Sequence, residues 1–181
     1  AGKLMSLVVC ASVLLFIVAS GLLTSSINNW FSIQVEKSLK SSFDVAQSFY
    51  EKAKTDTLYS AEVLSLYIAK NDLLQRSAKP ELAKAIEEKK AELHLSGVEL
   101  FDARARLLSR SIDRKLLKGG FLKTAPELVQ KGAQEEKMAI VRSSKAGDII
   151  IGIAPVYAPD GSAREIVGVI AVSTIIKSSL V

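Results

Sequence analysis

Residues 4–23 form an uncharged apolar stretch, and this feature restricts what the chain can fold into more than any other. Twenty residues in a helix rising about 1.5 Å per residue would cross a hydrocarbon core of about 30 Å. The chain then turns polar, and Trp30 follows where an indole ring prefers the headgroup layer. We therefore expect residues 1–26 to form a transmembrane helix, with lipid as a partner and Trp30 at the membrane interface.

A secretory signal peptide is the alternative interpretation of the same stretch. Lys3 would supply the basic region, and Ala19, Ser20 and Gly21 resemble a small-residue cleavage site. The apolar stretch is longer than the usual apolar region of about 7 to 15 residues in such peptides. This length favours a transmembrane anchor over a cleaved signal peptide.

Cysteine and histidine usage limits the chemistry of the remaining chain. Cys10 is the only cysteine and lies inside the apolar stretch, which leaves the rest without a disulfide, a haem attachment or a cysteine zinc site. His94 is the only histidine, so no Ser/His/Asp set is indicated around it. We expect no cofactor, no metal and no catalytic residue in this segment.

The charge pattern argues against nucleic acid as a partner. The net charge is +5, from 24 basic and 19 acidic residues, and bases alternate with acids, as in the Glu-Glu-Lys-Lys run at 87–90. Mixed charge of this kind is typical of a solvated helix face. Only Lys3 precedes the apolar stretch, so charge alone leaves the membrane orientation open.

Apolar residues recur at helical spacing beyond the expected membrane boundary. No Pro or Gly interrupts residues 22–79, and Asn71-Asp72 is the first plausible break. A long helix with one apolar stripe must bury that stripe, either against a parallel copy of itself or against its own domain. We expect a homodimer built on this stripe, which comprises Ile27, Phe31, Val35, Leu39, Phe43, Ala46, Tyr50 and Ala53.

After residue 95 the apolar period changes from 3.6 to 2. Pro80 begins a second helix that ends before Ser96-Gly97, and Thr124 to Glu127 fits a capping box opening a short helix toward Glu136. Turns are indicated at 102–105, 145–148 and 159–161. The expected strands are 98–101, 106–112, 138–142, 149–157 and 166–176.

This order of elements predicts an α+β fold. A transmembrane helix continues into a long helical stalk, and an antiparallel sheet with helices packed on one face follows. The expected domains are the transmembrane helix at 1–26, an extracytoplasmic helical region at 27–95, and the α+β domain at 96–181.

Two groups of segments resemble known receptors. The strand 97–102 (GVELFD) and the late pair 150–157 (IIGIAPVY) and 166–172 (IVGVIAV) resemble the Cache (PAS-like, PDC) sensor domains of bacterial receptors. The segments 27–50, with INNWF, VEKSL and VAQSFY, are similar to the region after a transmembrane helix in NtrY-type nitrogen-regulation sensor histidine kinases.

The resemblance implies a ligand-sensing input module in the inner membrane, with residues from about 27 onward in the periplasm or extracellular space. The signal would pass to a cytoplasmic kinase domain of the full-length chain. A phospho-accepting histidine would be followed by an acidic residue, whereas Leu95 follows His94. We expect His94 to be a partly buried residue near the end of a helix. The alternatives are the sensor domain of a chemoreceptor or cyclic-dinucleotide enzyme, and a membrane-anchored structural protein whose apolar stripe binds a partner.

In the resembling domains, the ligand lies between the sheet and the short helix or loops over its outer face. On the expected strands, Arg110, Arg142 and Tyr157 are the candidate ligand-binding residues. Two arginines could hold a carboxylate by bidentate hydrogen bonds, and the tyrosine could close the site. The alternative is that both arginines face solvent and Tyr157 belongs to the core.

Overall fold

The computed structural model describes residues 2–74, 79–120, 123–145, 147–159 and 165–176. The side chains of residues 2–11, 13 and 79 are outside this description, and Cys10 is among them. The turn expected at Asp160-Gly161 and the last residues, 177–181, also lie outside it. The chain divides into two compact units, Ala1–Phe49 and Tyr50–Val181, which are described separately.

The first unit belongs to helix α1, Gly2–Lys70. Its large apolar side chains are 41–74% exposed wherever they are described, Trp30 among them. By length and composition, α1 is the one helix among the described residues that could cross a membrane.

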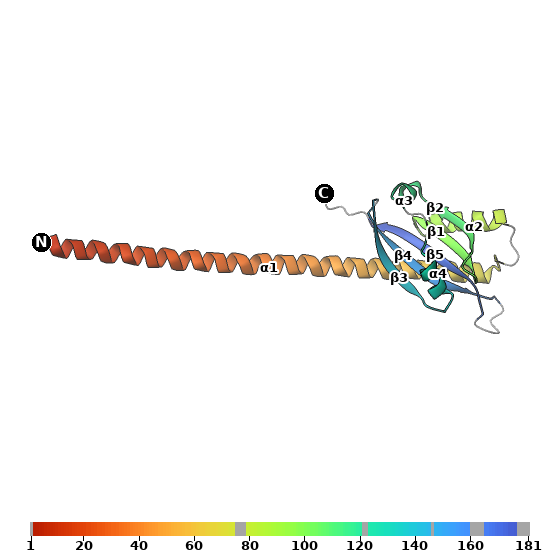
Figure 1. Cartoon of the computed structure of the whole chain (residues 1–181), viewed down its shortest axis with the longest axis horizontal. Helices are drawn as coiled ribbons and strands as arrows, with labels where there is room; N and C mark the ends of the chain where they lie inside the picture. The colour runs from red at the N-terminus through yellow and green to blue at the C-terminus, as the bar shows by residue number, and fades with distance from the viewer. Residues whose placement is uncertain (1, 75–78, 121–122, 146, 160–164, 177–181) are drawn as a thin grey trace. The chain divides into compact units, whose positions relative to one another are not determined.

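The second unit contains the end of α1 and all the remaining elements (Figure 1). The helices are α2 (Lys79–Glu92), α3 (Arg114–Lys118) and α4 (Pro126–Gly132). The strands are β1 (Gly97–Asp102), β2 (Leu107–Ile112), β3 (Met138–Ser144), β4 (Gly147–Tyr157) and β5 (Ile166–Ile176).

The five strands form one antiparallel sheet in the order β2-β1-β5-β4-β3. The middle strand β5 pairs with β1 on one side and with β4 on the other. Both edge strands, β2 and β3, are the partners of sequence-adjacent strands in hairpins. Because side chains alternate across each strand, the sheet presents two faces of different composition.

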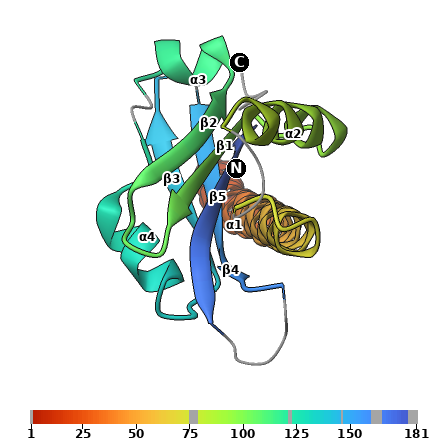
Figure 2. The ribbon, with the colours of Figure 1, turned by 90° about the vertical axis from the view of Figure 1, so that its right-hand side faces the viewer.

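One face of the sheet packs against α1 and α2, which lie side by side in Figure 2. Leu64 and Ile68 of α1 and Ile86 of α2 are at most 1% exposed there. The helix α1 comes so close to β4 that a Cβ atom on Gly152 would lie 2.7 Å from the backbone oxygen of Thr57. Only glycine therefore fits at that position.

The opposite face packs against the two short helices (Figure 2). Leu116 of α3 and Val129 of α4 are buried against the alternate residues of β4, Ile149, Ile151 and Ile153. The α+β fold with an antiparallel sheet and packed helices is confirmed. The two long helices share one face as expected, and the short helices add a layer on the other.

Several local predictions are confirmed by the backbone. The helix α1 ends at Lys70, just before the expected break, and Asp72 adopts a positive φ of 50°. The strand β5 has the expected bounds, and the other strands agree within two residues. In the 102–105 turn, the carboxylate of Asp102 accepts hydrogen bonds from the backbone N–H groups of Arg104 and Arg106.

The capping box was wrong. The N-cap of α4 is Ala125, which makes no side-chain capping bond, and the helix ends at Gly132 rather than near Glu136. The Thr124 hydroxyl is engaged elsewhere, because it donates to the buried carboxylate of Glu99. The Thr124 hydroxyl thus bonds to a residue distant in sequence instead of capping α4.

The compact unit begins at Tyr50, whereas the sequence analysis assigns residues 27–95 to a helical region of their own. Ala61, Leu64 and Ile68 explain this extension, since they supply part of the buried layer under the sheet. The last turns of α1 and all of α2 are structural parts of the sheet unit.

Candidate functional site

Glu99 is a buried acid on the face that α3 and α4 cover. It lies on β1 with Phe101, whose side chain belongs to the core of that face, and it is 1% exposed. One carboxylate oxygen, Oε2, accepts from the backbone N–H of Thr124 at 2.8 Å and from its hydroxyl at 2.6 Å. These bonds fasten the segment before α4 to the sheet.

Arg110, a candidate from the sequence, is the ionic partner of this acid. It stands opposite Glu99 in the β1–β2 register, and its Nε lies 3.3 Å from Glu99 Oε1. The Arg110 side chain remains 30% exposed, while Oε1 is buried and makes no hydrogen bond. Arg110 therefore balances the charge of a buried acid, which is a structural task.

Arg142, the second candidate, lies on the edge strand β3 and borders an open hollow of about 510 Å³. Lys145 lies in the turn of the same hairpin and lines both this hollow and a neighbouring one of about 450 Å³. Lys115 and Lys118 of α3 line the neighbouring hollow from the other side. We call the two together the basic hollow. It is walled by α3 and the β3–β4 hairpin.

The electrostatics of the basic hollow are one-sided. Among the described residues, none of its four cationic side chains takes part in an ion pair. Asp113 is the one acid among its described lining residues, and it accepts from Lys90 Nζ at 3.0 Å. Burial works to lower the pKa of Lys90, but its bonds to Asp113 and Glu87 outweigh burial and raise that pKa above its ordinary value. Asp113 is thus already engaged by a buried lysine.

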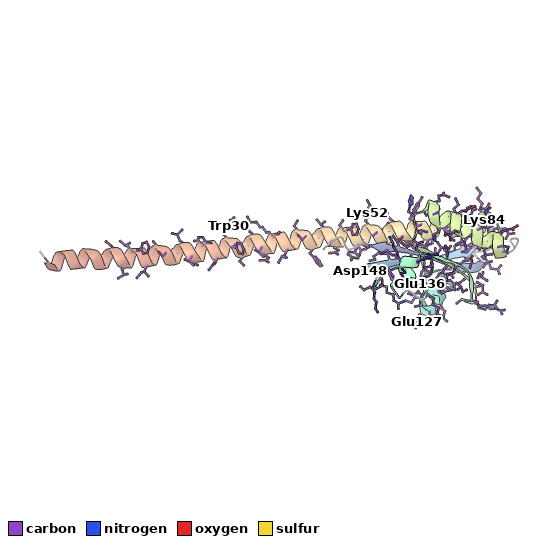
Figure 3. The ribbon with its side chains drawn as sticks, turned by 90° about the horizontal axis from the view of Figure 1, so that it is seen from above. Trp30, Lys52, Lys84, Glu127, Glu136 and Asp148 are labelled. Carbon is purple, nitrogen blue, oxygen red and sulfur yellow. The ribbon has the colours of Figure 1, made fainter. Side chains whose placement is uncertain are left out.

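A polar chain links the hollow's hairpin to α1. Ser143, which lines the hollow, donates to Asp148 Oδ1 at 2.7 Å, and the hydroxyl of Tyr50 donates to Oδ2 of the same carboxylate. The bond from Tyr50, followed by that from Ser143, lowers the pKa of Asp148, and the same Tyr50–Asp148 bond raises the pKa of Tyr50. Figure 3 labels Asp148 beside α1.

Tyr157, the third candidate, is separate from both arginines. It is half-buried at the end of β4, after an irregularity in the register between Val156 and Tyr157. There it borders a hollow of about 10 Å³ together with Ile68 and Ala69 of α1. That space is too small for a ligand.

The structure does not bring the three predicted residues together. Arg110 and Arg142 lie on the two edge strands, which four spacings of about 4.8 Å, roughly 19 Å, separate. Arg142 instead shares its hollow with Lys115, Lys118 and Lys145, which the sequence analysis missed. Their sequence pattern is a weak indication of a site, because lysines in a short helix or beside a turn are common on protein surfaces.

Chemically, the basic hollow is suited to an anion. Arginine presents paired donors and lysine a mobile point charge, and both form strong bonds with carboxylate or phosphate oxygens. Within the described residues, no group of three or more His, Cys, Asp or Glu side chains could hold a metal ion.

Comparison with known proteins gives matches among solved structures alone. No family model matches the sequence, and no curated protein does. The sensor domain of Escherichia coli DcuS is similar over 66% of this chain and 88% of its own, with 14% identity and a TM-score of 0.46. The sensor domain of the Vibrio cholerae histidine kinase DctB has 20% identity over 73% of this chain, with a TM-score of 0.41.

A third similar structure is the ligand-binding domain of the Campylobacter jejuni chemoreceptor Tlp3 in complex with 4-methylisoleucine. It shows 13% identity over 76% of this chain, with a TM-score of 0.48. The chain spans 57% of the DctB structure and 55% of the Tlp3 structure. The structural neighbours are thus sensor domains of histidine kinases and chemoreceptors. At these identities and TM-scores, they assign neither ligand nor partner to this chain.

Proposed function

We propose that this chain is a ligand-sensing input module anchored in the cytoplasmic membrane, with the sheet unit on the extracytoplasmic side. Its ligand is a small anion, with carboxylates as the first class to test. The module carries no catalytic step itself and acts by changing the state of its helix α1.

The basic hollow carries this proposal. Four cations have no acidic partner among the described residues and line two neighbouring hollows of the sheet unit: Lys115, Lys118, Arg142 and Lys145. Unpaired like charges repel one another, so such a cluster is more stable when a bound anion neutralises it. A surface with only a structural role would be more stable with acidic residues interspersed among the cations.

The second support is the helix α1 itself. The same helix contains the apolar stretch of a candidate membrane span and the residues that pack under the sheet, Leu64 and Ile68. A ligand that binds two states of the sheet unit with different affinity would therefore shift the equilibrium of a helix that enters the lipid. We propose Trp30 as the residue at the membrane interface.

The finer parts of the proposal concern partners. The apolar stripe from Ile27 to Ala53 pairs with a second copy, and a cytoplasmic kinase domain of the NtrY type follows in the full-length protein. Phe31, Leu39 and Phe43 of the stripe are 63–67% exposed in the single chain. Pairing with a second copy would bury these apolar side chains.

The same exposed stripe favours a second candidate function, a membrane-anchored protein that binds a partner helix and uses the sheet unit as a passive cap. A chemoreceptor or cyclic-dinucleotide enzyme in place of the kinase would leave the sensing proposal intact. The two functions differ in whether the sheet unit binds a ligand.

The test is a thermal-stability screen of the full chain in lipid nanodiscs against a library of small carboxylates. A ligand at a hundred times its Kd should raise the free energy of unfolding by about 2.7 kcal/mol. We expect a saturable shift that Arg142→Ala abolishes and Lys84→Ala, on the exposed side of α2, leaves unchanged. No shift with any anion would favour the partner-binding function.

A further inference from the structure

The two hollows around Lys145 are neighbours that share lining residues. Gly119 and Lys145 line both, and their volumes are about 450 and 510 Å³. Lys115 and Lys118 approach from α3, while Arg142 and Lys145 approach from the β3–β4 hairpin. Donors therefore converge on the space from two separate elements.

The charge in this space exceeds what one carboxylate would neutralise. Four cations line it, and the one lining acid, Asp113, already accepts from Lys90. A monocarboxylate would leave three positive charges close together without a partner. Charge matching thus favours an anion with at least two negative charges.

The types of donor, three lysines and one arginine, favour a tetrahedral anion. A planar carboxylate is best held by the fork of one arginine, whereas phosphate oxygens point several ways and suit lysines as well as arginine. Ser143 and Ser144 add hydroxyl groups at the hairpin, and Ile149 and Ile175 are the large apolar residues among the described lining.

We propose that the basic hollow binds a phosphoryl group carrying two or more negative charges. The inference rests on the proposed function only in taking the same hollow as the ligand site, and it names the ligand class. Two sources share this chemistry: a soluble phosphorylated solute and the phosphate headgroup of an anionic lipid.

The experiment uses the full chain in nanodiscs of phosphatidylcholine, with inorganic pyrophosphate as the soluble probe and sodium chloride of equal ionic strength as the control. A parallel sample replaces half of the lipid with phosphatidylglycerol. Thermal stability and hydrogen exchange of the segments 113–120 and 138–149 are measured in both. The variants are Arg142→Ala/Lys145→Ala and the control Lys84→Ala, whose side chain is exposed on α2.

For a soluble ligand, we expect pyrophosphate to raise the melting temperature saturably and to slow exchange in both segments. For a lipid ligand, we expect the slower exchange in the phosphatidylglycerol discs without any probe. In either case the hollow's double variant should weaken the effect about tenfold or more, and the α2 variant should not.

The inference is overturned if neither sample shows protection, or if the double variant responds like the wild type. Tricarballylate, a carboxylate without phosphorus, separates this failure from that of the proposed function. If tricarballylate binds in an Arg142-dependent way and pyrophosphate does not, the anion sensor stands and the phosphoryl class is wrong. If no anion in either screen binds, both proposals fail.

Discussion

The two faces of the sheet are built for different purposes. The face under α1 and α2 is a closed apolar layer, in which the Ser65 hydroxyl donates to the backbone oxygen of Pro155. The face under α3 and α4 contains a buried acid, Glu99, with its ionic partner Arg110 and the basic hollow at one end. Figure 3 shows Lys84 on the α2 side and Glu127 on the α4 side.

The first face contributes mainly to stability through apolar burial, whereas the second contains the charged side chains. Long helices bury a large apolar area on one face and so fix the position of α1 against the sheet. Short helices and loops on the other face leave room for charged side chains and for an open hollow. Under the proposed function, binding of a ligand on the second face would be transmitted to α1 through the sheet.

The largest loss of stability should come from truncating a buried side chain in the closed face under α1 and α2. Leu64→Ala in α1 removes a fully buried side chain, and we expect a loss of about 2–5 kcal/mol in the free energy of unfolding, from lost burial and the cavity left behind. Denaturant unfolding of the full chain in detergent measures it. Leu66→Ala, two residues on and 68% exposed, is the matched control and should change little. Equal effects of the two would contradict the assignment of the buried side of α1.

An intermediate effect is expected on the other face. Glu99→Ala leaves the Thr124 N–H and hydroxyl without this acceptor and removes the ion pair with Arg110, so we expect a loss of about 1–3 kcal/mol. Glu88→Ala, an exposed acid on α2, should stay within about 0.5 kcal/mol of the wild type. If Glu99→Ala were neutral, the loop before α4 would be held by other contacts.

A smaller effect is expected from the buried hydrogen bond that Ser65 of α1 makes with β4 in the closed face. Ser65→Ala should lower the free energy of unfolding by about 0.5–1.5 kcal/mol, because the backbone oxygen of Pro155 loses a buried donor. Ser60→Ala removes a hydroxyl that bonds within α1 alone and serves as the control. A larger loss in Ser60→Ala than in Ser65→Ala would place the key contact elsewhere.

The smallest effect should depend on pH. The lowered pKa of Asp148 means that its bond from Tyr50 adds stability above the ordinary aspartate pKa of 3.8, and this is lost as pH falls through the lowered value. The raised pKa of Tyr50 means that the bond is fully present below 10.0 and is lost as pH rises through the raised value. The stability difference between wild type and Tyr50→Phe should therefore be largest near neutral pH. A difference that grows in acid would contradict this.

The strands could be predicted because their signal is local. The apolar run of β5, from Ile166 to Ile176, lies in the middle of the sheet with partners on both sides, and such strands read as continuous apolar segments. The end of α1 at Lys70 and the turn at Asp102 likewise follow from residues adjacent in the chain.

The site could be predicted only in part, because its contacts join residues far apart in sequence. Thr124 has the local pattern of a helix cap, yet Glu99 lies 25 positions earlier and takes its hydroxyl. Arg110 and Arg142 are on the expected strands, but the strand order that puts them on opposite edges is a property of the whole sheet. His94, expected to be partly buried at a helix end, is exposed in a turn with a φ of 53°.

The central claim is that ligand binding belongs to the face under α3 and α4 and reaches α1 through the sheet unit. Hydrogen exchange of the full chain in nanodiscs, with and without the best anion from the two screens, tests it most directly. We predict slower exchange first in segments 113–120 and 138–149 and, as a consequence, a changed rate around Tyr50, with no direct protection of α2. Protection confined to α2 or to the 27–49 segment would contradict the account.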